Sequence, residues 1–288
     1  MIREEVIGLI KAAAINWVRD YAQSMGAALA FYTMFSIAPL LLIVSSIAGV
    51  VFGEGTARAE ILYQLQGILG TTGALEVQGL LENARKPTGS LLAVMVGTAF
   101  LVIGATAVFA ELQDALDRIW RAPAATDSRF SLWRLVRARL LSFGIVLGIG
   151  FLLMVSLMFS AVLDVLSRWW NPRFDGWVNV AHAFNVMLSV VLSTAVFAMI
   201  YKLMPRVVID WKDVWIGAVV NSLLFIAGKF LIGMYLGRSG VSARFGPAGS
   251  LLVVLLWVYY SAQVFLFGAE FTWAYSHQFG SRKGQPPN

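Results

Sequence analysis

The chain has 288 residues, of which 59% are hydrophobic and 13% are charged, and it contains no cysteine. A soluble globular domain has about 25% charged residues, so this chain has too little charge to cover a globular surface. The composition excludes a disordered chain and argues against a soluble enzyme. The absence of cysteine excludes disulfides and thiolate metal ligands. The mean hydropathy of +0.75 instead indicates an integral membrane protein.

Six apolar segments are long enough to cross a bilayer as helices, which takes about 20 residues each. Their approximate bounds are residues 27–52, 89–110, 140–163, 180–201, 214–236 and 250–271. We therefore predict an all-α integral membrane protein with six transmembrane helices.

The distribution of Lys and Arg predicts the orientation of these spans. Fourteen of these residues fall on the side that holds both termini, seven fall on the opposite side, and Lys229 lies inside a span. Because positive charge is enriched in cytoplasmic segments, both termini are expected in the cytoplasm. The net charge of +6 then reflects topology and attraction to anionic membrane lipids, and it requires no nucleic-acid partner.

Three regions are expected along the chain. Residues 1–26 form an amphipathic segment lying in the membrane interface, residues 27–275 form the membrane domain with a helical external loop at 53–88, and residues 276–288 form a disordered tail. The apolar stripe of the first segment has the three- and four-residue spacing of a helix over residues 2–22. Its members are Val6, Leu9, Ile10, Ala13, Trp17 and Tyr21.

Polar residues within the spans are candidates for a substrate path, because polar groups in lipid are costly. The candidates are Ser36, Pro39, Asn185, Asn221, Lys229, Gln263 and Glu270. Five of them have a structural alternative. Lys229 could extend to the outer headgroups, Asn221 and Gln263 could bond neighbouring helices, and Glu270 could be an interfacial carboxylate. Pro39 predicts a kink that serves either as a hinge or as fixed shape.

Arginines in the second loop form a further candidate site. Arg134, Arg137 and Arg139 alternate with Trp133, Leu135 and Val136. They either anchor the loop on the cytoplasmic side or bind anionic lipid headgroups, whose phosphate suits the guanidinium fork.

Enzymatic chemistry is not expected from this sequence. It contains neither a Walker phosphate loop nor a dinucleotide fingerprint. Its two histidines, His182 and His277, fall on opposite sides of the membrane in the predicted topology. They cannot share a metal, so a metal-dependent nuclease is implausible, and we expect no catalytic residue, metal or cofactor.

Several segments resemble motifs of the YihY/BrkB family of bacterial inner-membrane proteins. These segments are Ala27–Leu40, Asp114–Trp120, Tyr201–Pro205, Trp211–Tyr235 and Gly246–Phe271. Asp117 stands where the family pattern has asparagine. The resemblance implies a location in the bacterial inner membrane and brings a virulence-factor label together with an older ribonuclease BN label, which the histidine positions contradict. It implies no catalytic residues.

Two functions remain open from the sequence. The first is a transporter or translocator of a lipid or another amphiphile, without its own ATPase, whose substrate is anionic or amphiphilic. The second is a non-transport scaffold that binds partners through the N-terminal helix and the arginine loop. A polar interior facing the candidate residues favours the first, and a sealed apolar interior favours the second.

Overall fold

A computed structural model describes residues 2–34, 36, 106–123, 177–239 and 249–284, together with positions 53, 55, 59, 62, 75, 78 and 79. Every regular element in this part of the chain is an α-helix, and no described residue is in a strand. The predicted all-α class is confirmed for these residues.

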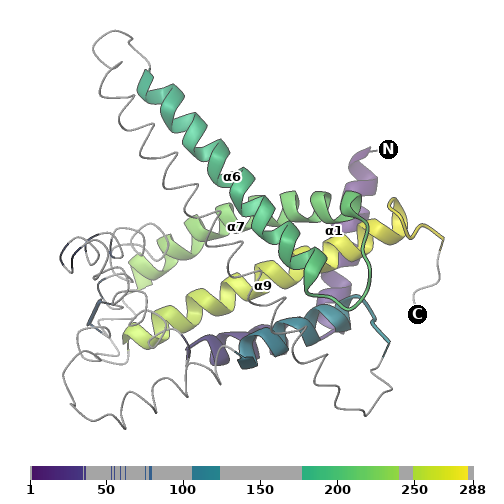
Figure 1. Cartoon of the computed structure of the whole chain (residues 1–288), viewed down its shortest axis with the longest axis horizontal. Helices are drawn as coiled ribbons and strands as arrows, with labels where there is room; N and C mark the ends of the chain where they lie inside the picture. The colour runs from purple at the N-terminus through teal and green to yellow at the C-terminus, as the bar shows by residue number, and fades with distance from the viewer. Residues whose placement is uncertain are drawn as a thin grey trace. The chain divides into compact units, whose positions relative to one another are not determined.

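Four helices carry labels in Figure 1, namely α1 (Ile2–Arg19), α6 (Trp177–Leu203), α7 (Trp211–Ser239) and α9 (Gly249–Gln278). Two more helical segments cover residues 22–34 and 106–119. In the predicted external loop, positions 59, 62, 75, 78 and 79 are helical.

Three helical segments are long and apolar enough to cross a membrane, and they correspond to the fourth, fifth and sixth predicted spans. Their bounds are Val186–Leu203, Trp211–Ile232 and Leu252–Gln278. Of the first two predicted spans, residues 27–34, 36 and 106–110 are described and are helical. The rest of those two spans and the whole third span lie outside the described residues.

Helix α9 is longer than its predicted span, which stopped at Phe271. It continues to Gln278, because Ala274 and Ser276 are buried and extend the packed face of the helix past the end of the apolar run. The hydropathy pattern predicted that the span ends near Glu270, whereas this residue lies about two turns before the end of the helix.

The predicted N-terminal helix is slightly shorter than expected, and the helix of the first predicted span begins earlier than expected. Helix α1 ends at Arg19, and Tyr21 adopts a left-handed backbone with φ 59°. The Tyr21 carbonyl then accepts hydrogen bonds from the N–H groups of Ser24 and Met25, which begins the helix over 22–34. Only part of the predicted apolar stripe is buried.

Helix α1 presents three sectors. Leu9 and Ala13 are buried, whereas Val6 and Ile10 of the same predicted stripe are exposed. By helical geometry these two lie beside the buried sector, and Lys11 lies across from it. An exposed apolar sector between a packed one and a polar one suits a helix that lies in a membrane interface.

The expected disordered tail is ordered as far as residue 284, which corrects the sequence-based expectation. Residues 276–278 complete α9 and residues 279–284 form turns. The Ser281 N–H and hydroxyl both donate to Oδ2 of Asp213, at 3.2 and 2.6 Å. A buried carboxylate at the start of α7 therefore holds this segment, a long-range partner that composition cannot reveal. Residues 285–288 lie outside the described part.

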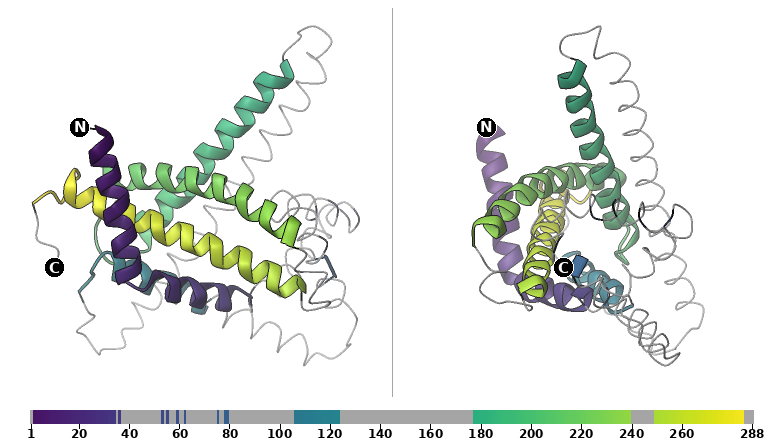
Figure 2. Two further views of the ribbon diagram at one scale, coloured as in Figure 1. Left: turned by 180° about the vertical axis from the view of Figure 1, so that it is seen from behind. Right: turned by 90° about the vertical axis from the view of Figure 1, so that its left-hand side faces the viewer.

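The chain divides into two compact units. Unit 1 comprises Met1–Asn16, Leu116–Ile226 and Gly268–Asn288, and unit 2 comprises Trp17–Ala115 and Ala227–Phe267. Helices α1, α7 and α9 contribute to both units. In each unit α7 packs against α9, and Figure 2 shows these two helices side by side in both of its views.

Helix α7 has an apolar exposed face and a buried face of small and polar residues. The exposed face includes Trp215, Val219, Leu223, Phe230 and Met234, and the buried face includes Asp213, Gly217, Ala218, Asn221 and Ser222. This reverses the pattern of a soluble surface helix, as expected where lipid is the solvent and small residues allow close helix packing.

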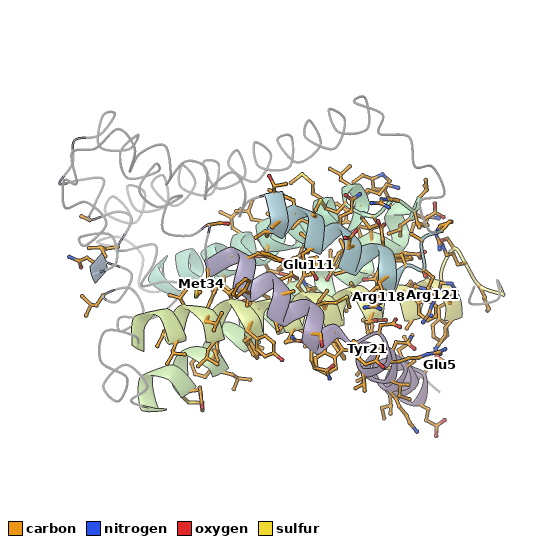
Figure 3. The ribbon with its side chains drawn as sticks, turned by 90° about the horizontal axis from the view of Figure 1, so that it is seen from below. Glu5, Tyr21, Met34, Glu111, Arg118 and Arg121 are labelled. Carbon is orange, nitrogen blue, oxygen red and sulfur yellow. The ribbon has the colours of Figure 1, made fainter. Side chains whose placement is uncertain are left out.

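Unit 2 contains the helix over 22–34, the first part of the helix over 106–119 and parts of α7 and α9. Figure 3 shows the helix that carries Met34 beside the helix that carries Glu111. Gly26 faces the Gln263 side chain of α9, and Gly228 of α7 faces the Tyr260 ring. Larger side chains at these two glycines would collide with those neighbours, so glycine allows the close approach.

Candidate polar site among the membrane helices

Buried polar side chains concentrate in unit 1. Of the ten buried polar or charged residues in the described part, Asp20 and Ser36 belong to unit 2 and the other eight belong to unit 1. The eight are Asp117, Thr194, Asp213, Asn221, Ser222, Glu270, Thr272 and Ser276. A polar interior inside an apolar exterior is costly unless it is hydrogen-bonded or used, so the partners of each group matter.

Among the described residues, the Asn221 amide and the Thr194 hydroxyl are polar groups of this interior that lack a hydrogen-bond partner. The Asn221 side chain is completely buried, and neither the oxygen nor the nitrogen of the amide has a hydrogen-bond partner among the described residues. Leaving such a group unpaired costs about 1–3 kcal/mol. The interhelical hydrogen bond considered for Asn221 is therefore not found in this part of the chain.

Asn221 and Tyr201 converge on Gly268 of α9. The point that a Cβ of residue 268 would occupy lies 2.5 Å from Oδ1 of Asn221 and 2.6 Å from the hydroxyl oxygen of Tyr201. Tyr201 is also completely buried. The glycine thus leaves room for an amide and a hydroxyl, contributed by α7 and α6, to meet on the surface of α9.

The hydroxyl groups around this point are satisfied by backbone carbonyls. Ser222 Oγ donates to the Val190 carbonyl at 3.2 Å, and Thr272 Oγ1 donates to the Gly268 carbonyl at 2.7 Å. Gly217 of α7 faces the Thr272 side chain. These contacts hold α6, α7 and α9 together, and they leave both atoms of the Asn221 amide without a hydrogen-bond partner among the described residues.

Glu270 is buried among the helices of unit 1. Its side chain has no exposed surface. It lies two residues beyond Gly268, which corresponds to a rotation of about 200° around α9. Gly268 and Thr272 face α7. Glu270 therefore projects from a different side of α9 and does not lie where Asn221 and Tyr201 approach Gly268.

Gln263 lies in unit 2 and behaves as the structural alternative describes. Its Nε2 donates to the carbonyls of Ala22 and Gln23, at 3.4 and 3.3 Å. Ser36, also in unit 2, donates through Oγ to the Tyr32 carbonyl of its own helix at 3.1 Å. The predicted substrate-path residues therefore do not all meet at one described point.

The other predicted site residues cannot be placed by their side chains. Asn185 and Lys229 lie on α6 and α7, but their side chains are outside the described part of the chain. Pro39 and the loop arginines Arg134, Arg137 and Arg139 lie outside the described residues altogether.

A clamp beside the polar interior was missed by sequence reasoning. The Arg206 backbone N–H donates to Oδ1 of Asp117 at 2.7 Å, and Arg206 Nε lies 3.1 Å from Oδ2. Asp117 precedes a Schellman helix end in which Arg121 has φ 49° and the Ala122 N–H donates to the Asp117 carbonyl. The only sequence signal for this clamp was the departure from asparagine at position 117.

Aromatic rings and basic side chains complete the same end of unit 1. The Arg121 guanidinium lies 5.1 Å from the Trp273 ring centre, and that of Arg282 lies 5.2 Å from the ring of buried Trp120. Such contacts contribute about 0.5–2 kcal/mol each. They connect the helix over 106–119 to α9 and to the segment after it.

Comparison with known proteins gives a family match over most of the chain. The family described as Virulence factor BrkB matches residues 14–288. The chain belongs to this family. Residues of its motifs, including Trp120, Tyr201 and Gly268, are buried together in unit 1, so the sequence resemblance and the packing agree.

Curated relatives are distant and share the same description. A UPF0761 membrane protein of Pseudomonas aeruginosa is 25% identical over 264 residues, which is 89% of this chain but 60% of that relative. One from Tolumonas auensis is 25% identical over 299 residues, covering 96% of this chain and 90% of the relative. The chain thus spans about three fifths of the Pseudomonas protein. No solved structure matches it. Family and helices together make it a membrane protein.

Proposed function

We propose that this BrkB-family chain is a multi-pass protein of the bacterial inner membrane with both termini in the cytoplasm. Three apolar helices and the exposed apolar face of α7 support several crossings. The excess of Lys and Arg on the side of the termini supports the orientation.

We further propose that the protein moves a lipid or another amphiphile across this membrane without an ATPase of its own. The observation that carries this proposal is the fully buried amide of Asn221 beside the Tyr201 hydroxyl, an amide that has no hydrogen-bond partner among the described residues. Such groups offer both donors and an acceptor to the polar head of a passing molecule, while the apolar exterior keeps its chains in lipid.

The energetic argument favours a functional over a structural role for Asn221. An amide with a structural role would stabilise the fold through its hydrogen bonds, whereas the Asn221 amide has none among the described residues. Functional sites are where stability is commonly sacrificed. Asn221→Leu is therefore expected to change the free energy of unfolding by less than about 1 kcal/mol, because apolar groups replace unpaired polar ones at little cost.

Reconstitution tests the proposal. The full chain is placed in liposomes of phosphatidylethanolamine and phosphatidylglycerol that contain a fluorescent lipid, and dithionite quenching measures its movement between leaflets. We expect exchange well above that of protein-free liposomes. Asn221→Leu should lower the rate at least about tenfold, as loss of one hydrogen bond to a polar head implies.

The matched control is Leu223→Ala, on the exposed face of the same helix. It should keep the parent rate. Exchange equal to that of empty liposomes would reject lipid translocation, and equal rates for the two variants would reject the role of Asn221. Thermal unfolding of each variant establishes that a lost rate does not reflect a lost fold.

A scaffold is the second candidate, and the exposed surface of α1 favours it. Ile7, Ile15 and Val18 are exposed on a helix whose other side is packed. In this case crosslinking in cells should capture a protein partner through α1, and Ile7→Glu should abolish the capture while lipid exchange stays at background. The loop arginines Arg134, Arg137 and Arg139 are proposed to anchor on anionic lipid in either case.

A further inference from the structure

The connection between α6 and α7 carries an exposed apolar and basic surface. Val208 is 81% exposed, the highest value among the exposed large apolar side chains of the described residues. Trp211 and Trp215 are 51% and 46% exposed, with ring centres 6.5 Å apart. Lys202 and Lys212 flank them. We call these five residues the interface patch.

The backbone under the patch is held in place. The Arg206 N–H donates to Asp117, and Nη2 of Arg282 donates to the Val208 carbonyl at 3.0 Å. The exposed Val208 side chain thus lies on a backbone that is held by hydrogen bonds at Arg206 and at Val208 itself. A fixed surface loses little conformational freedom on binding, which favours a defined site over diffuse contact.

Lys202 is oriented toward the same surface. Its Nζ lies 5.4 Å from the Trp211 ring centre and donates to the Ile209 carbonyl. An ammonium has three donors, so donors remain for a ligand. The exposed carboxylate in this connection is Asp210, against the basic side chains of Lys202, Arg206 and Lys212. Because Arg206 is paired with Asp117, Lys202 and Lys212 are left against the single carboxylate of Asp210 at this surface.

We propose that the interface patch binds the headgroup of an anionic phospholipid. The patch lies where α7 begins, and α7 is a candidate span from Trp211 onward, so it falls at the depth where headgroups meet the apolar core. Tryptophan favours that depth. Val208 and the two rings contact the acyl region, and Lys202 and Lys212 contact the phosphate. The site is independent of whether the protein moves lipid.

Lipid titration of the purified full chain in neutral detergent tests this assignment. Native mass spectrometry measures the binding of phosphatidylglycerol and of phosphatidylcholine. We expect phosphatidylglycerol to bind more tightly, and Lys212→Gln to weaken its binding about fivefold, the usual effect of one basic residue at a charged headgroup. Trp211→Ala should weaken the binding of both lipids.

The control is Lys11→Gln, which removes an exposed lysine from α1. It should leave phosphatidylglycerol binding unchanged. An equal loss in Lys11→Gln and Lys212→Gln would mean diffuse attraction and would overturn the site. Equal affinity for the two lipids would overturn it as well. Because Lys212 has an exposed side chain, its variant is expected to fold normally.

Discussion

Asp117 and Arg206 contact each other through both carboxylate oxygens, one by a backbone hydrogen bond and one by an ion pair. The backbone bond at 2.7 Å fixes the start of the α6–α7 connection on the helix over 106–119. The ion pair is the weaker part, because the Arg206 side chain is 49% exposed and that of Asp117 is 11% exposed.

Two variants should distinguish the contributions of these two contacts to stability. Asp117→Ala removes both and should lower the free energy of unfolding by about 2 kcal/mol, since hydrogen bonds to charged groups contribute about 1.5–3 kcal/mol. Arg206→Ala keeps the backbone donor and should cost below about 1 kcal/mol. Thermal unfolding in detergent measures both. Equal losses would show that the side-chain ion pair, not the backbone bond, dominates.

The same geometry predicts the effect of Asp117→Asn on the free energy of unfolding. Asparagine keeps an oxygen acceptor for the Arg206 N–H and loses the charge, so its effect should fall between the parent and Asp117→Ala. The family resemblance, in which asparagine is expected here, leads to the same outcome. A loss as large as that of alanine would show that the charge is essential.

Gly268→Ala should disrupt the meeting point of α6, α7 and α9. The added methyl would lie 2.5 Å from Oδ1 of Asn221 and 2.6 Å from the Tyr201 hydroxyl. Overpacking of this kind costs about 1–3 kcal/mol. The matched control is Gly8→Ala, whose Cβ meets nothing within 4 Å and should stabilise α1 by up to about 1 kcal/mol. Thermal unfolding gives the comparison, and an unchanged Gly268→Ala protein would refute the close approach.

Glu111 should make stability depend on pH. Burial, and then the nearby charge of Asp114, raise the pKa of the Glu111 carboxyl above its ordinary value of 4.5. The folded state therefore holds this proton to higher pH than the unfolded state. Stability is greatest below the ordinary pKa and declines as the pH rises through the raised value. Glu111→Gln should remove this decline and raise the melting temperature slightly at pH 7. Parallel stability curves for parent and variant from pH 4.5 to 8 would contradict this reading.

The absence of cysteine provides a direct test of topology. Single substitutions can be labelled with a maleimide that does not cross the membrane, on a background without competing thiols. Lys11→Cys and Lys283→Cys should react only after the inner membrane is opened, whereas Gly55→Cys should react in cells with a permeable outer membrane. All three positions are exposed. Labelling of Lys283→Cys in intact cells would reverse the proposed orientation.

The sequence by itself determined that this protein lies in a membrane, and it determined where the helices α6, α7 and α9 lie along the chain. An apolar run of about 20 residues specifies a spanning helix through local composition alone, which is why the bounds of α6 and α7 and the start of α9 were predicted closely. The motifs around Trp120, Tyr201 and Gly268 likewise identified the family without any structure.

Only the tertiary structure decided which polar residues meet. Asn221 and Gln263 looked equivalent in the sequence, yet Gln263 bonds the carbonyls of Ala22 and Gln23 while Asn221 stays unpaired among the described residues. Hydrogen-bond partners lie far apart along the chain, as Asp213 and Ser281 also do. Composition and periodicity report the solvent that each residue prefers, whereas pairing depends on how helices are brought together in space, so no local pattern could separate these two amides.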